Sequence, residues 1–181
     1  MQRAIQEKIR LPAIVRDLRR SVVELLDRPA SELAGHQAFK SDQRLLALWA
    51  ADCAEHVLPY FEEKYPEDDR PRKAIEACRA WVATGVFRMA DVRKASLAAH
   101  AAARQAKEED AIAAARAAGQ AMATPHVPTH ALGAAAYAIK AAAINSENVE
   151  EAIRKERDWQ LQRLLVLINQ RSDRDAKLHR H

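Results

Sequence analysis

The chain has 181 residues, a length that suits one domain with a single contiguous core. Alanine supplies 39 residues and glycine only 4, and aromatic residues make up 5% of the chain, so a β-sandwich, a β-barrel and a Rossmann domain are excluded and an all-α fold is predicted. The formal net charge of +4 comes mostly from residues 1–28, and acidic residues interrupt the basic ones elsewhere, so the charge does not favour a nucleic-acid-binding surface.

The N-terminal part of the chain predicts one helix followed by a connection. Residues 13–27 carry apolar side chains at helical spacing and end before Pro29. Residues 29–40 lose this periodicity and contain Gly35, so they are expected to connect the first helix to the next. Residues 1–40 are therefore assigned to an N-terminal helix and its connection.

Two helices with larger apolar side chains are expected next, separated by an acidic run. Ser41 is expected to cap a helix that ends near Tyr60, and Asp69 is placed to cap a helix that ends before Gly85. Residues 62–69 lie between these helices and carry five acidic side chains. The apolar stripe of the first of the two helices contains Leu45, Leu46, Trp49, Cys53 and Val57.

Three alanine-rich helices follow, over residues 88–106, 108–123 and 129–144. Alanine occupies 23 of the 49 positions from 95 to 143, and such small side chains let helix axes approach closely. The helix over 129–144 is apolar around nearly its whole circumference, which is typical of a central helix. A final helix is expected to end near residue 170.

These elements predict a single-domain bundle of about six to seven helices with a central alanine-rich helix. Its parts are residues 1–40, the alanine-rich core over 41–145, the C-terminal helix over 146–171 and a frayed tail over 172–181. Alanine-rich faces can pack within one chain or between two, so a homodimer stays an alternative.

Cysteine usage and hydropathy indicate a cytoplasmic protein. Cys53 and Cys78 lie on apolar stripes, as expected of buried thiols in a reducing compartment. Residues 1–11 alternate charged and apolar side chains and lack the apolar stretch of a signal peptide. No long uncharged apolar segment suited to crossing a membrane is expected either.

Several polar side chains fall on or beside the expected apolar stripes. Asp52 and His56 are four residues apart on one helix face, which suits either two metal ligands or a polarised imidazole, or else an ion pair that ties the helix to a neighbour. His126 and His130 share a His-x3-His spacing, but Pro128 places His126 outside the helix, and the helix dipole at His130 disfavours its protonated form.

No metal or other cofactor is expected. A zinc site would need a third ligand beside His126 and His130, for which His100, His56 and Asp52 are the candidates. The chain has no Glu-x-x-His motif and no glycine-rich phosphate loop. His100 and Arg116 lie at the edges of their stripes, where they are expected to brace helices. No catalytic residue is assigned. The polar cluster candidates are Asp52, His56, His100, Arg116, His126 and His130.

A charged loop over residues 62–72 is the candidate surface for binding a partner. Charged runs of this kind are mostly solvated surface, but they also supply specificity in recognition. The candidates for partner binding are Glu62, Glu63, Glu67, Asp68, Asp69, Arg70 and Arg72.

Three sequence elements resemble bacterial immunity proteins of the immunity-protein-five-like family. They are the Asp-Cys-Ala-Glu stretch from Asp52, the Arg-Pro-Arg stretch from Arg70 and the His-x3-His-Ala element from His126, and the resemblance extends over about two thirds of the chain. It implies an all-α protein that binds and blocks a cognate toxin. It also implies recurrent positions at Trp49, Asp52, Asp69, Arg70, Arg72, Trp81, His126, His130 and Trp159.

The leading hypothesis is therefore a non-enzymatic, cytoplasmic immunity protein whose partner is a toxin protein. One alternative is a metal-dependent or acid-base enzyme that uses the Asp and His candidates, which requires their helices to bring them together. A second alternative is a basic, helical nucleic-acid-binding protein that uses Arg16, Arg19 and Arg20.

Overall fold

The computed structural model describes residues 36–178, with side chains over residues 43–171. Within this span the chain forms seven helices and no strand, which confirms the predicted all-α bundle. The helix predicted over residues 13–27 lies outside the described residues. In chain order the helices are α3 (His36–His56), α4 (Pro59–Glu62), α5 (Arg70–Thr84), α6 (Met89–Gln105), α7 (Glu109–Ala123), α8 (His130–Ile144) and α9 (Val149–Leu178).

Three helix ends differ from the prediction. The chain is already helical from His36, five residues before Ser41, and no Gly or Pro lies between His36 and Ser41 to interrupt the helix. Helix α3 also ends earlier, at His56, and Pro59 begins the one-turn helix α4. Helix α9 continues to Leu178, beyond the predicted end near residue 170, because no Gly or Pro interrupts it.

The ends of α5 follow the predicted pattern at one end only. Gly85 adopts a left-handed φ of 69°, and its N–H closes the last turn, as predicted. Asp69 occupies the N-cap position, but its side chain makes no capping hydrogen bond and pairs with Lys73 instead. The carboxylate of Asp68 accepts the backbone N–H of Arg70 at 3.2 Å.

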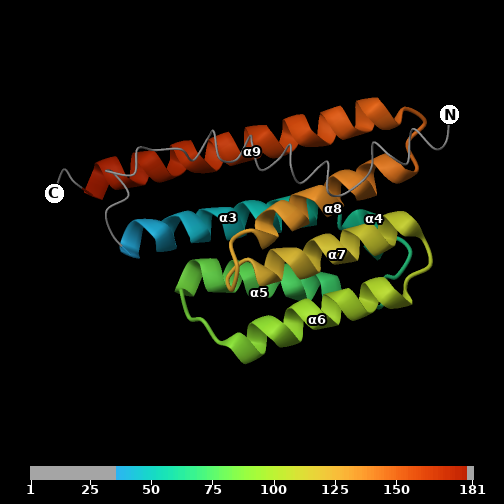
Figure 1. Ribbon diagram of the computed structural model, residues 1–181, viewed down its shortest axis with the longest axis horizontal. Helices are drawn as coiled ribbons and strands as arrows, with labels where there is room; N and C mark the ends of the chain where they lie inside the picture. The colour runs from blue at the N-terminus through green and yellow to red at the C-terminus, as the bar shows by residue number, and fades with distance from the viewer. Residues whose placement is uncertain (1–35, 179–181) are drawn as a thin grey trace.

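The helices are arranged in successive rows across the molecule (Figure 1). Helix α9 lies along one edge, α3 and α8 lie beside it, α7 and α5 come next, and α6 forms the opposite edge. The contacts of α7 extend to α3, α4, α5, α6 and α8, so α7 has more neighbours than any other described helix. None of the helices described is both long and apolar enough to cross a lipid bilayer.

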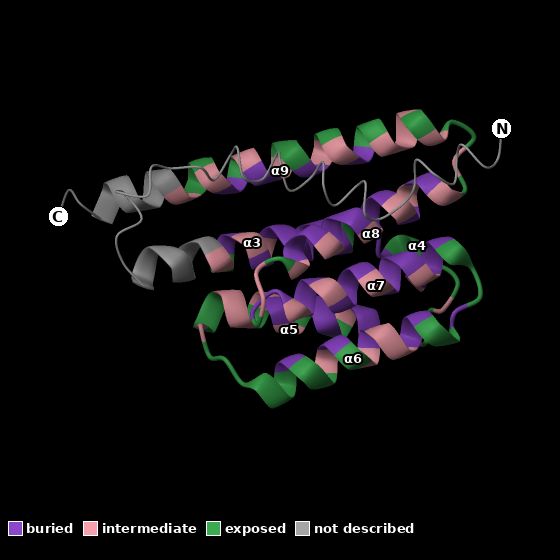
Figure 2. Ribbon diagram, in the orientation of Figure 1, coloured by how far each residue is buried: buried purple, intermediate pink, exposed green. Residues whose placement is uncertain are grey.

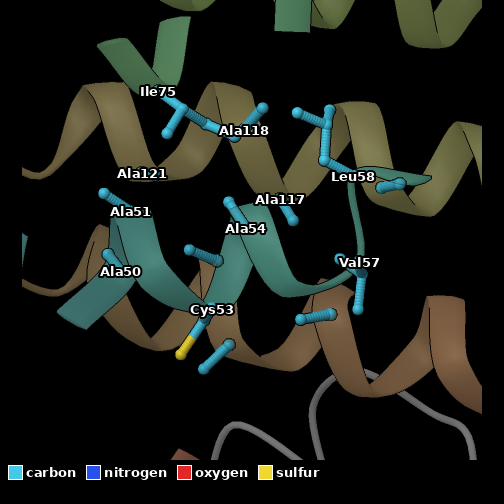
Figure 3. Close-up of a cluster of buried hydrophobic side chains, with 14 of the residues drawn as sticks. Ala50, Ala51, Cys53, Ala54, Val57, Leu58, Ile75, Ala117, Ala118 and Ala121 are labelled. Carbon is cyan, nitrogen blue, oxygen red and sulfur yellow. The ribbon is translucent and has the colours of Figure 1, made fainter. Parts of the chain in front are cut away.

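Buried residues concentrate in the central helices of the bundle (Figure 2), and most of the buried apolar residues are alanine. Nine of the 15 residues of α8 are buried, as predicted for a central helix, and ten of the 15 residues of α7 are buried as well. Between α3 and α7 the contact is made by small side chains, as Figure 3 shows for Ala51 and Ala54, which lie toward Ala121 and Ala117. The helices are therefore held at short separation by side chains of one carbon.

This packing leaves no room for a larger side chain on α7. We expect Ala118→Leu, at a fully buried site, to lower the free energy of unfolding by roughly 1–3 kcal/mol because leucine must push α3 or α5 away. Urea denaturation would measure the change. The matched control is Ala80→Leu on the exposed side of α5, which should leave the midpoint nearly unchanged; equal effects at both positions would contradict the expected close packing.

Candidate functional site

Polar side chains gather at three places in the described part of the molecule. The first is the Asp52 network, formed by Asp52, Glu55, Arg79 and Arg163. The second is the histidine cluster, formed by His100, His126 and His130. The third is the charged loop over residues 62–72, which includes the ends of α4 and α5.

The Asp52 network joins three helices. Asp52 of α3 is only 6% exposed, and its two carboxylate oxygens accept hydrogen bonds from Arg79 of α5 at 2.8 Å and Arg163 of α9 at 2.7 Å. Arg79 also donates to Glu55, one turn further along α3. Because one buried carboxylate on α3 accepts hydrogen bonds from an arginine of α5 and an arginine of α9, Asp52 fixes both helices to α3.

His56 makes a separate link between α3 and α9. Its ring stacks on Trp159 with centroids 3.8 Å apart, and its Nδ1 lies 2.9 Å from a carboxylate oxygen of Glu156. Asp52 and His56 therefore lie on one helix face, as their spacing predicts. Each of them contacts a different residue of α9, and the structure of the described residues shows no ion pair between the two. This is the helix-tying role, made with partners on a different helix.

The buried polar residues of α9 were not among the candidates predicted from the sequence. Gln160 is fully buried, donates to the carbonyl of Ala135 at 3.0 Å and to Glu156 at 2.9 Å, and accepts the indole N–H of Trp49 on its own carbonyl at 2.9 Å. A signal was present, because Glu156 and Gln160 fall on the stripe that Ile153, Leu164 and Leu167 define at helical spacing.

In the histidine cluster, His100 of α6 lies over Gly119 of α7. A Cβ atom at Gly119 would come within 2.7 Å of the imidazole, so the ring occupies the space that the missing side chain leaves. Nδ1 of His130 lies 2.6 Å from the carboxamide oxygen of Gln120, so a hydrogen bond joins the start of α8 to α7. His126 lies in the loop before α8, outside the helix as predicted.

Both helical histidines favour the neutral form. Burial lowers the pKa of His100, and the nearby charges of Arg116, Arg104 and His130 lower it further. Burial also lowers the pKa of His130, with a smaller contribution from His126. The neutral imidazole expected for His130 therefore has burial as its main cause.

The described residues offer neither a metal site nor a reactive thiol. No three His, Cys, Asp or Glu side chains among them are arranged to hold a metal ion. Burial raises the pKa of Cys78 to about 12, and burial also raises the pKa of Cys53 well above its ordinary value, so both cysteines are protonated at neutral pH. The polar candidates also fall into two groups: Asp52 and His56 are tied to α9, and His100, Arg116 and His130 lie on α6, α7 and α8.

The charged loop neutralises much of its own charge. Arg72 forms a two-pronged pair with Glu62 at 2.5 and 2.8 Å, and Arg70 forms another with Asp68 at 2.7 and 2.6 Å. Asp69 pairs with Lys73. Of the five acids in the loop, Glu63 and Glu67 make no ion pair within the described part of the chain. The loop is thus a braced structure with two unpaired acids.

We expect the charge of Asp52 to matter more than that of an exposed aspartate. Asp52→Asn should lower the free energy of unfolding by about 1–3 kcal/mol, because two guanidinium groups lose a charged acceptor. Chemical denaturation of the purified variant measures this loss. Asp158→Asn on the outer side of α9 is the matched control and should have no measurable effect; a harmless Asp52→Asn would show that the network does not hold the helices.

The neutral histidines predict a loss of stability in mild acid. As the pH falls below 6.5, the ordinary pKa of histidine, the unfolded chain binds protons before His100 and His130 do in the folded chain, so the free energy of unfolding decreases. The double variant His100→Gln, His130→Gln should lose less stability than the parent protein between about pH 7.5 and about pH 5.5. Equal slopes of stability against pH for both proteins would contradict this.

The part of the chain that forms the bundle is also the part that matches a known protein family. A family model described as Imm-5 like putative immunity protein matches residues 36–167, which is more than two thirds of the chain. The matched region contains α3 to α8 and the larger part of α9. No curated protein and no solved structure matches the chain. The Asp52 network, the histidine cluster and the charged loop all lie inside the matched region. The chain therefore belongs to the Imm-5 like putative immunity protein family.

Proposed function

We propose that this protein binds a cognate bacterial toxin in the cytoplasm and neutralises it by protein–protein contact, without catalysing a reaction. The observation that carries the proposal is the family match over residues 36–167, since an immunity protein implies a toxin as its partner. The family also favours a non-enzymatic role. The enzyme alternative has less support, because the described residues hold no metal-ligand group and both thiols stay protonated.

The construction of the bundle supports an inhibitory binding role. An inhibitor gains affinity when its surface is already ordered, because less conformational entropy is lost on binding. Here the outer helix α9 is fixed to α3 through Asp52, His56 and Trp49, and the charged loop is fixed by its own pairs between arginine and acid. The surface offered to a partner is therefore preorganised.

The charged loop is our first candidate for the toxin contact. Glu62, Asp68 and Asp69 are committed to pairs inside the loop, so reversing their charge would disturb the loop as well as any interface. Glu63 and Glu67 are exposed and free of such pairs within the described residues. They are the acids that can attract a basic toxin surface without weakening the fold.

The proposal is tested by identifying the partner and then rebuilding the complex. The tagged protein is used to capture its partner from a lysate of its own cells, the captured protein is identified by mass spectrometry, and both are purified for binding and for a co-expression survival assay. We expect a partner that is toxic when expressed alone and harmless when this protein is present. A partner whose toxicity is unaffected by co-expression would overturn the proposal.

The same complex measures the part played by the loop. Glu63→Lys, Glu67→Lys should weaken binding by about tenfold or more, with a smaller loss at high salt because the attraction is screened. Glu147→Lys, Asp158→Lys makes the same charge change at exposed positions elsewhere and should leave the affinity nearly unchanged. Unchanged binding by the loop variant would remove the loop from the interface and leave the toxin-binding role intact.

A further inference from the structure

A second surface with the properties of an interface lies at the edge of the bundle opposite α9. Seven large apolar side chains are exposed in the described part of the chain, and four of them fall between residues 86 and 97. These are Val86 at 62% exposure, Phe87 at 43%, Met89 at 37% and Leu97 at 55%. Apolar side chains that gather on a surface mark interaction sites more often than scattered ones do.

These side chains belong to the α5–α6 connection and to the outward side of α6. Helix α6 forms its main contacts with α5 and α7 only, so its opposite side is open along the edge of the molecule (Figures 1 and 2). Leu97 lies on that side together with residues 90, 94, 101 and 104, which follow one another at steps of three and four. Ala90 and Ala101 keep the stripe flat, so a partner can lie close to it.

This surface is basic, and its basic side chains form no ion pairs within the described part of the chain. Arg88, Arg93, Lys94 and Arg104 are all exposed, Asp91 is the only acid from residue 86 to residue 106, and none of the four bases forms an ion pair with another described residue. The bases of the charged loop differ in this respect, because Arg70, Arg72 and Lys73 are each paired with an acid. Here the positive charge is available to a partner.

We infer that the α6 face, meaning residues 86–89 and the outward side of α6, binds an acidic surface of the partner protein that has an apolar centre. The inference rests on the proposed function and adds the chemistry of one contact surface. Phe87, Met89 and Leu97 supply the apolar area, and the arginine and lysine side chains around them select an acidic partner.

The charge pattern favours this occupant over two others. A symmetric dimer through the α6 face would place the same basic surface of two copies together, so that positive charge would face positive charge. A nucleic acid would engage the bases but would leave Val86 and Leu97 without an apolar partner. An acidic protein surface with an apolar centre satisfies both the charges and the apolar side chains.

The α6 face also adjoins the charged loop. Gln105, at the end of α6, accepts a hydrogen bond of 2.5 Å from Arg70. A partner that covers α6 can therefore continue onto the loop, so that unpaired bases and unpaired acids are both offered along one edge of the bundle. Such a pattern fixes the orientation of a partner as well as attracting it.

The test uses the full-length protein and the purified toxin from the complex described above. Leu97→Asp and the double variant Arg93→Glu, Lys94→Glu should each weaken binding about tenfold or more, and the double variant should lose more at about 0.05 M than at about 0.5 M salt. The matched controls are Leu161→Asp and the double variant Arg154→Glu, Lys155→Glu on the outer side of α9. Circular dichroism and thermal unfolding show whether each variant is folded.

Each outcome separates the inference from the proposed function. Loss of binding by the folded α6 variants, with binding retained by the α9 controls, supports the inference. Toxin binding that is equal for the α6 variants and the controls overturns the inference and leaves the proposed function in place. A wild-type protein that binds no toxin overturns both. If the α6 variants lose only self-association, measured by sedimentation, the α6 face binds a second copy of the chain and the inference is wrong. If they lose only a gel shift with duplex DNA, the α6 face binds nucleic acid and the inference is wrong.

Discussion

The close approach of helices through alanine is the constraint on which the rest of this structure depends. Helices α3, α7 and α8 meet through side chains of one carbon, as at Ala54 and Ala117, so each contact buries little apolar surface while holding the backbones at short separation. Large side chains such as Trp49, Phe61 and Ile75 fill the spaces around these contacts. Spacing between the helices is therefore set by the smallest side chains, and a single larger one on α7 would displace its neighbours.

The polar networks add the specificity that small apolar side chains lack. Alanine faces have few features that distinguish one helix register from another, whereas Asp52 can accept from both Arg79 and Arg163 only when α3, α5 and α9 are correctly aligned. Gln160 sets the register of α9 against α8 and α3 through the carbonyl of Ala135 and the indole of Trp49. Polar residues that the sequence presents as candidate chemistry thus act here as positioning contacts between helices.

Two surfaces of the bundle carry charged side chains that can bind a partner protein, because those side chains form no ion pair with another described residue. Ion pairs inside the charged loop hold its shape and neutralise part of its charge, and Glu63 and Glu67 are the two acids of the loop without an ion pair to the described part of the chain. On α6 the basic side chains form no ion pair with another described residue, although Asp91 lies on the same helix, and exposed apolar side chains lie on the same segment of the chain. A protein that must hold one partner needs both a rigid surface and charge left over for that partner. The family to which the chain belongs gives this arrangement its proposed meaning, which is the neutralisation of a toxin.

Composition and helical periodicity determined the all-α class, the burial of α8, the left-handed stop at Gly85 and the position of His126 outside a helix, because these features depend on residues near one another in the chain. The same patterns misplaced the start of α3 and the end of α9, where no strong breaker marks the boundary that was assigned. Only the tertiary structure decided that Asp52 and His56 contact α9, that the charged loop is paired internally, and that α6 lies at an edge where its basic side chains form no ion pair with another described residue. These properties depend on which helices become neighbours, and with faces as uniform as those of alanine the choice of neighbours is made by long-range contacts such as Asp52 with Arg163, which local patterns do not encode.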